Sequence, residues 1–330
     1  MMLIDNYKRK INYLRVSVTD RCDLRCTYCM AEDVTFLPRQ EVLSIEEIIK
    51  LISIFNELGV TKFRLTGGEP LVRKNIISVI EYLNSLKNQN KIKEHTLTTN
   101  GTNLSKYAKI LKDNGVNRIN VSLDSLDPQK YREITKHGDI KKVIDGIESC
   151  IELDIKVKIN TVLTQNFNDE EVFDIIRWCQ KKRCDISLIE VMPIGSIGEK
   201  RFNQYLSMKK FEEQLVSKLK LSPSNYKTNG PSRYFSNTDN ESKIGIISAI
   251  SHNFCDTCNR VRLTCTGKLY MCLGQNDYVD LKYALRNMSK IDIIKQIEYA
   301  MTIKPQKHNF EISKNNYEGY VNRHMNETGG

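Results

Sequence analysis

The chain has 330 residues, of which 40% are hydrophobic and 27% are charged, and its formal net charge is +10. That much apolar sequence excludes a disordered protein and is enough for one large domain, or for a barrel-sized domain with an appendage. No apolar run reaches about 18 residues and the first ten residues lack an apolar signal core, so we expect a soluble, cytoplasmic protein without a membrane span. The positive charge is spread over polar helix faces and identifies no partner by itself.

Short runs rich in β-branched residues alternate, over the first 200 residues, with longer stretches that place apolar residues at intervals of three and four. This alternation predicts parallel strands joined by crossover helices, an α/β fold. Six such units are fewer than the eight of a closed barrel, so we expect a partial (β/α)6 TIM-type barrel, with a doubly wound sheet as the alternative. The expected strands are Leu14–Val18, Lys62–Thr66, His95–Thr99, Arg118–Leu123, Val157–Leu163 and Ile186–Val191, and the expected helices are Ser44–Leu58, Lys74–Leu86, Leu104–Asn114, Ile140–Leu153 and Asp169–Lys181.

The alternation ends near residue 200. A helical pattern over Met208–Leu221 is followed by the polar stretch Ser222–Lys243, whose composition predicts a mobile loop, and then by the apolar run Ile244–Ile250. We therefore divide the chain into a barrel of residues 1–200 and a C-terminal segment of residues 201–330 that closes the open side of the barrel.

Seven of the ten cysteines lie in two groups, with Cys150, Cys179 and Cys184 elsewhere. Gaps of two and three residues suit a metal centre better than disulfides and indicate a reducing compartment. The first group, Cys22-x3-Cys26-x2-Cys29, follows the first expected strand and offers three thiolates to a cuboidal cluster whose fourth iron stays open. Such an iron can be chelated by S-adenosylmethionine. Zinc completed by a distant residue is the alternative, because residues 19–42 hold no fourth Cys or His.

The run from Cys22 to Cys29 resembles the CxxxCxxC signature of the radical S-adenosylmethionine (SAM) superfamily, including the aromatic Tyr28 before the last cysteine. Gly67-Gly68-Glu69-Pro70, directly after the second expected strand, resembles the second hallmark of that superfamily, the segment that meets the methionine amino group. The resemblance implies a partial barrel of the radical SAM kind.

The second group is Cys255-x2-Cys258-x13-Cys272. Cys265 lies between the last two and could close a four-cysteine zinc site, so spacing alone leaves zinc and an iron-sulfur cluster equally open. Arg260 and Arg262 favour the cluster, because alternate residues of an extended segment point to one side and guanidinium groups suit phosphates or developing charge.

From Leu14 to Gly330 the chain resembles the GTP 3′,8-cyclase family of molybdenum cofactor biosynthesis, which carries both clusters on one chain. The segments that carry this resemblance are Thr98-Thr99-Asn100-Gly101, Asn120-Val121-Ser122-Leu123-Asp124-Ser125-Leu126-Asp127, Lys158-Ile159-Asn160, Glu190-Val191-Met192 and Gly329-Gly330. The resemblance implies a lyase that converts GTP to (8S)-3′,8-cyclo-7,8-dihydroguanosine 5′-triphosphate, with a C-terminal tail that reaches into the active site. It also implies an external one-electron donor and a following enzyme as partners, no nucleic acid or membrane, and a homodimer as an open question.

The same resemblance assigns roles to residues. It implies a first 4Fe-4S cluster on Cys22, Cys26 and Cys29 and a second on Cys255, Cys258 and Cys272. Cys265 is not a required ligand in the family pattern, so we expect it to be a small packed residue. SAM would contact Tyr28, Gly68, Ser122 and Met192, while GTP would contact Arg15, Arg64, Thr98, Lys158, Arg260, Val261 and Arg262, of which Arg15, Arg260 and Arg262 would be catalytic. Cations make independent sense here, because no P-loop pattern occurs and side chains must carry the triphosphate.

Two other functions fit parts of the sequence. A radical SAM maturase that modifies peptides also carries an auxiliary cluster, but nothing in such an enzyme requires Arg260 and Arg262. A zinc-stabilised nucleic-acid module fits the net charge of +10 and the pair Cys255-x2-Cys258, and it predicts binding with a steep salt dependence.

Overall fold

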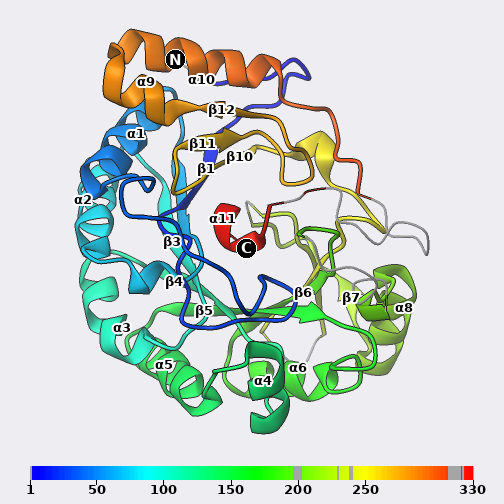
Figure 1. The fold of residues 1–330 in the computed structure, drawn as a ribbon. Helices are drawn as coiled ribbons and strands as arrows, with labels where there is room; N and C mark the ends of the chain where they lie inside the picture. The colour runs from blue at the N-terminus through cyan, green and yellow to red at the C-terminus, as the bar shows by residue number, and fades with distance from the viewer. Residues whose placement is uncertain are drawn as a thin grey trace.

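The computed structural model describes residues 2–195, 203–228, 230–237, 241–310, 321 and 323–329. Within these ranges twelve strands form one sheet in the order β12-β11-β10-β1-β2-β3-β4-β5-β6-β9-β8-β7, which curves around an open centre without closing (Figure 1). The six predicted strands are confirmed, and each pairs in parallel with the next along the chain. They are β1 (Tyr13–Ser17), β2 (Lys62–Thr66), β3 (Glu94–Thr99), β4 (Arg118–Ser122), β5 (Lys156–Leu163) and β6 (Asp185–Glu190).

Helices cover the outer face of these strands (Figure 1). The first begins at the predicted capping box, where Ser44 and Glu47 each accept a hydrogen bond from the other's backbone N–H, and it buries Ile48, Leu51 and Phe55 against the sheet. The five predicted helices are α1 (Ile45–Glu57), α2 (Ile76–Asn88), α3 (Leu104–Asp113), α5 (Ile140–Glu152) and α6 (Val172–Lys181). An additional short helix, α4 (Pro128–Thr135), begins at the Asp127 cap.

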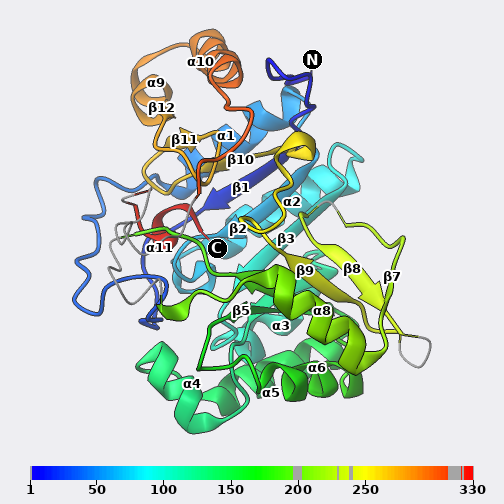
Figure 2. The same ribbon diagram turned by 90° about the vertical axis from the view of Figure 1, so that its right-hand side faces the viewer.

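The C-terminal segment extends the parallel sheet at both edges. One of its strands, β9 (Ile244–Ile247), pairs in parallel with β6, and another, β10 (Arg260–Leu263), pairs in parallel with β1. The barrel of six βα units therefore becomes a curved sheet of eight parallel strands in the described residues. Antiparallel strands continue both edges: β11 (Lys268–Tyr270) and β12 (Tyr278–Asp280) beside β10, and β8 (Arg233–Ser236) and β7 (Ser222–Pro223) beside β9 (Figure 2).

The expectation of a structureless loop over 222–243 is wrong for the residues that form β7 and β8. Tyr234 and Phe235 are buried and β8 completes its backbone hydrogen bonds on β9, which outweighs the polar composition of the stretch. The predicted helix after residue 207 is confirmed as α8 (Met208–Leu219), and the helices α9 (Leu281–Asn287) and α10 (Lys290–Thr302) lie beside β12 (Figure 1). Among the described residues, no helix has the length and apolarity needed to cross a membrane.

The end of the chain returns to the centre of the barrel. There the short helix α11 (Met325–Thr328) lies against β1, inside the curve of the sheet (Figures 1 and 2). Asn326 donates to the backbone oxygen of Asp20, in the loop that follows β1 (3.0 Å). Gly329 approaches β2 so closely that a Cβ atom there would lie 2.2 Å from Thr66 Oγ1, so only glycine fits this position. Gly330 lies outside the described residues.

Candidate active site

Two adjoining cavities occupy the centre of the barrel. The first cavity contains the triad Cys22, Cys26 and Cys29, and the second cavity contains the triad Cys255, Cys258 and Cys272. The cavities meet at four side chains that line both of them: Asn160, Ile189, Met192 and Met325. The structure thus brings together two cysteine groups that lie more than 220 residues apart in the sequence.

The loop that carries the first triad is fixed to the loop after β3. Asn100 Nδ2 and the Leu24 backbone N–H donate to Cys22 Sγ at 3.7 and 3.4 Å, and the Asp23 carboxylate accepts from Asn100 Nδ2 (2.7 Å) and Thr102 Oγ1 (2.6 Å). All three thiols are free of disulfides, and burial raises the pKa of Cys22 to about 12. Donors aimed at a sulfur atom favour a thiolate once a positively charged metal centre is bound.

Gly68 and Glu69 hold the loop after β2 against the triad loop. The Gly68 N–H donates to Thr19 O (2.9 Å) and the Glu69 N–H donates to Arg21 O (2.8 Å). The buried Glu69 carboxylate accepts from Thr99 Oγ1 (2.9 Å) and from the backbone N–H groups of Leu71 (2.9 Å) and Asn100 (2.7 Å). Burial raises the pKa of Glu69 to about 7. One carboxylate therefore joins the loops after β2 and β3 beside the first cavity.

The residues predicted to bind SAM all line the first cavity: Tyr28, Gly68, Ser122 and Met192. The Tyr28 hydroxyl donates to Asp124 Oδ2 (2.7 Å), and burial raises the pKa of that carboxyl group to about 6. Thr98, predicted to bind GTP, also lies in this cavity, but its hydroxyl accepts from Arg64 Nη1 (3.4 Å), which lines the second cavity. Thr98 therefore stands where the two cavities approach each other.

The second cavity is lined by five predicted cations from four neighbouring or facing strands: Arg15, Arg64, Lys158, Arg260 and Arg262. Arg15 is the register partner of Arg64 on one side and of Arg262 on the other. Within the described part of the chain none of the five forms an ion pair, whereas Arg118 in the same cavity pairs with Glu94. Buried cations without carboxylate partners are complementary to an anionic ligand.

The unpaired donors of Arg15 and Arg64 also favour an anionic ligand in the second cavity. Nε and Nη2 of Arg15 and Nε of Arg64 are buried without a hydrogen-bond partner. Burial, followed by the charge of Arg262, holds the pKa of Arg15 well below its usual range. Unsatisfied donors of this kind are costly unless a ligand meets them.

Lys158 donates a hydrogen bond to a residue that the sequence analysis did not predict. Its ammonium group donates to the Tyr234 hydroxyl (2.7 Å), and burial lowers the lysine pKa to about 7. Tyr234 is on β8, in the polar stretch that predicted a loop, so no local signal marked it.

The predicted approach of the C-terminal tail to the site is visible in the described residues. Arg262 Nη1 donates to the backbone oxygen of Gly329 (2.7 Å), and Met325 lines both cavities. The tail therefore lies at the junction of the two cavities.

Val261 and Cys265 lie away from the cavity. Val261, predicted to contact GTP, is 1% exposed and packs in the core on the opposite face of β10 from Arg260 and Arg262. Cys265 does not line the cavity; its backbone oxygen accepts from the Leu43 N–H (2.7 Å), and burial raises its pKa to about 12. This agrees with a packed rather than a ligating Cys265.

The second triad has cations at its sulfur atoms. Arg260 Nη2 and Lys304 Nζ each lie 3.9 Å from Cys258 Sγ. Burial opposes ionisation of Cys258, but Arg260 and Lys304 outweigh it and lower the pKa of the thiol to about 7. In the described residues no three His, Cys, Asp or Glu side chains are gathered closely enough for one metal ion. Free thiols that line a cavity, with donors directed at Cys22 Sγ in one triad and at Cys258 Sγ in the other, fit the wider 4Fe-4S cluster.

Comparison with known proteins agrees with these features. Residues 16–179 match the radical SAM superfamily and residues 184–310 match the family Molybdenum Cofactor Synthesis C. Proteins named GTP 3′,8-cyclase from Brucella ovis and Sinorhizobium medicae are 49% and 48% identical over 329 residues, which is 99% of this chain and 96% and 94% of theirs. The fold is similar to that of Streptococcus suis SuiB bound to S-adenosylmethionine, with a TM-score of 0.65 at 16% identity over 86% of this chain and 66% of SuiB. Because the identity extends over nearly the whole length, the chain belongs to the GTP 3′,8-cyclase family of radical SAM enzymes.

Proposed function

We propose that the chain acts as a GTP 3′,8-cyclase in which the first cavity binds SAM and the second binds GTP. Membership in the family makes the chain a radical SAM enzyme of molybdenum cofactor biosynthesis that uses SAM and iron-sulfur clusters. This assignment of the two cavities rests on the five cations of the second cavity, which form no ion pair with any described residue and lie next to the second triad. Nearly full-length identity to cyclases favours this function over a peptide maturase or a zinc-stabilised nucleic-acid module.

In the first cavity, Cys22, Cys26 and Cys29 would hold a 4Fe-4S cluster, and Gly68, Tyr28, Ser122 and Met192 would hold SAM. When bound, the cluster and SAM would supply the radical chemistry needed to abstract hydrogen from the ribose of GTP. The protein would position the cofactor and exclude water from it. Glu69 fixes the loops around the cofactor, and Met325 lies at the junction with the second cavity.

In the second cavity, Arg15, Arg64 and Lys158 would neutralise the triphosphate, and Thr98 would contact GTP where the cavities meet. Arg260, Arg262 and the backbone of Val261 would orient the nucleotide next to Cys255, Cys258 and Cys272, which would hold the second 4Fe-4S cluster. Arg15, Arg260 and Arg262 touch the substrate in this arrangement and are the proposed catalytic residues. The expected product is (8S)-3′,8-cyclo-7,8-dihydroguanosine 5′-triphosphate.

Anaerobic reconstitution tests the proposal. We expect about eight iron atoms per chain, as two 4Fe-4S clusters require. With a chemical reductant, SAM and GTP, the protein should form 5′-deoxyadenosine and the cyclised nucleotide together. Arg260→Ala should still form 5′-deoxyadenosine but lose the cyclised product. Unchanged product formation by that variant would remove Arg260 from the mechanism, and iron without GTP binding would contradict the proposed substrate.

Further proposals concern partners, location and domains. The reaction needs an external one-electron donor, and we propose that a following enzyme consumes the product. We propose a homodimer because α9 and α10 expose Tyr283, Ile291 and Tyr299 at 62%, 65% and 58%. The free cysteines support a reducing cytoplasm. We retain the division into residues 1–200 and 201–330 as a proposal.

A further inference from the structure

The second triad is carried by two strands whose hydrogen-bond ladder stops before it reaches the cysteines. Strand β10 begins two residues after Cys258, and β11 ends two residues before Cys272. The antiparallel register of the two strands covers only the pairs Arg262↔Tyr270 and Leu263↔Leu269. The backbone next to the cysteines therefore needs hydrogen-bond donors from elsewhere in the chain.

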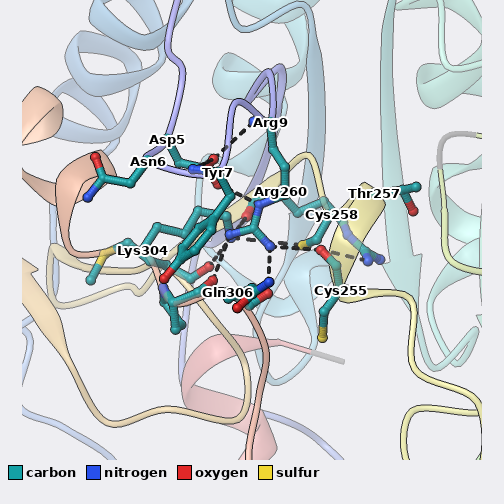
Figure 3. A network of polar contacts seen from close by, with 12 residues as sticks. Asp5, Asn6, Tyr7, Arg9, Cys255, Thr257, Cys258, Arg260, Lys304 and Gln306 are labelled. Carbon is teal, nitrogen blue, oxygen red and sulfur yellow. Dashed lines mark hydrogen bonds and ion pairs between the residues drawn. The ribbon is translucent and has the colours of Figure 1, made fainter.

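Lys304, which follows α10, supplies donors at this point (Figure 3). Its side chain is buried (3% exposed), and Nζ donates to the backbone oxygens of Arg260 (3.0 Å) and Met271 (2.5 Å). Met271 immediately precedes Cys272, and the same Nζ lies 3.9 Å from Cys258 Sγ. One ammonium group thus joins the two backbone segments that carry Cys258 and Cys272.

A second buried cation nearby shows what is unusual about Lys304. Arg9 donates to the backbone oxygen of Cys255 (2.7 Å), but its Nε pairs with Asp5 (2.6 Å), so its charge is balanced (Figure 3). Lys304 forms no ion pair with any described residue. An ammonium group buried without a carboxylate is costly unless another anion is close. Cys258 Sγ lies 3.9 Å from Nζ and would be such an anion as a cluster-bound thiolate.

Lys304 is also separate from the substrate. It lines neither cavity, so it cannot contact GTP or SAM directly. An effect of Lys304 on the reaction must therefore be indirect, through the second triad or through Arg260, whose backbone oxygen it binds.

We infer that Lys304 is a positioning residue for the second iron-sulfur cluster: it fixes the separation of Cys258 and Cys272, and its positive charge favours the reduced state of the cluster. The inference rests on the proposed function, in which this triad holds a 4Fe-4S cluster. It adds a residue that lies outside both cysteine motifs.

The test uses the full-length chain with Cys22, Cys26 and Cys29 changed to serine, so that only the second triad can bind a cluster. After anaerobic reconstitution this background should hold about four iron atoms per chain. Lys304→Met removes the charge and the donors, Lys304→Gln removes the charge but keeps two N–H donors, and Lys307→Met is the matched control, because Lys307 is exposed in the same segment. The midpoint potential is followed by electron paramagnetic resonance, and the loss of iron to a chelator by absorbance.

Both Lys304 variants should make reduction about tenfold less favourable, a fall in potential of about 59 mV. Only Lys304→Met should also lose iron faster, because Gln can still bridge the two carbonyl groups. Lys307→Met should match the background in both measurements. Unchanged midpoint potentials in both Lys304 variants would overturn the inference but not the proposed function. If Lys304→Met fails to fold, an unchanged midpoint potential in Lys304→Gln overturns the inference. A background without iron would overturn the proposed second cluster and the inference with it.

Discussion

Replacing Gly68 by alanine tests how the loop after β2 shapes the first cavity. A Cβ atom at this position would lie 2.3 Å from Arg21 O, 2.6 Å from Arg21 C and 2.7 Å from Asp20 O. Carbon atoms in good contact lie about 3.5–4.0 Å apart, so the two loops must separate by on the order of 1 Å. Arg21 immediately precedes Cys22, and the displacement therefore moves a proposed cluster ligand. A misplacement of about 1 Å can reduce a rate by about 10²-fold, equivalent to about 2.7 kcal/mol of activation free energy.

The assay is the rate of 5′-deoxyadenosine formation by anaerobically reconstituted protein with a chemical reductant, together with the iron content. Gly230→Ala is the control, because Gly230 lines the second cavity and not the first, and the nearest atom to its added Cβ would be Thr228 Oγ1 at 3.5 Å, an ordinary contact. Both variants are assayed without GTP. We expect Gly68→Ala to form 5′-deoxyadenosine about 10²-fold more slowly and Gly230→Ala to retain the wild-type rate. A Gly68→Ala protein with the wild-type rate and iron content would refute the reasoning, since the loops would then have room for a side chain.

Three further predictions follow from other contacts. Arg64→Met should weaken GTP binding by about 10- to 100-fold, because a hydrogen bond to a charged group contributes about 1.5–3 kcal/mol. Replacing the exposed Arg177 by methionine is the control and should leave GTP binding unchanged. Equal GTP affinities of the two variants in titration calorimetry would show that Arg64 does not face the nucleotide. Tyr234→Phe removes the acceptor of the 2.7 Å hydrogen bond from Lys158. The free energy of unfolding, measured by urea denaturation, should fall by about 1 kcal/mol. An unchanged free energy would show that this hydrogen bond gives no net stabilisation. The pKa of Glu69 is raised to about 7 in the folded state. Wild-type protein without clusters should therefore lose stability relative to Glu69→Gln as the pH rises from about 4.5 to 7. A stability difference between the two proteins that does not change with pH in urea titrations would contradict this.

The regular elements of the barrel were predictable because their signals are local. Alternating β-branched runs and spacings of three and four apolar residues located six strands and five helices, and the capping box at Ser44 marked the start of α1. The helix α4 was missed, because it is short and largely polar. The strands β7 and β8 were missed because they form only against β9, where the burial of Tyr234 and Phe235 outweighs the polar sequence around them.

The residues of the candidate site also divide into those marked by a local motif and those that depend on distant partners. The cysteine triads and the pair Arg260 and Arg262 were recognisable from their spacing and from family resemblance. Tyr234 and Lys304 carry no motif, because each matters only through a partner distant in the sequence: Lys158 in one case and the backbone beside Cys258 in the other.

The sequence by itself determined the class of fold, the grouping of the cysteines into two triads and the resemblance to the family, since spacing within a loop and periodicity within an element are properties of neighbouring residues. Only the tertiary structure decided that the C-terminal segment adds a parallel strand to each edge of the barrel, that the two triads open into adjoining cavities, and that Lys304 joins the backbone around the second triad. These features depend on how the curved sheet brings distant segments together, and no local pattern encodes that arrangement.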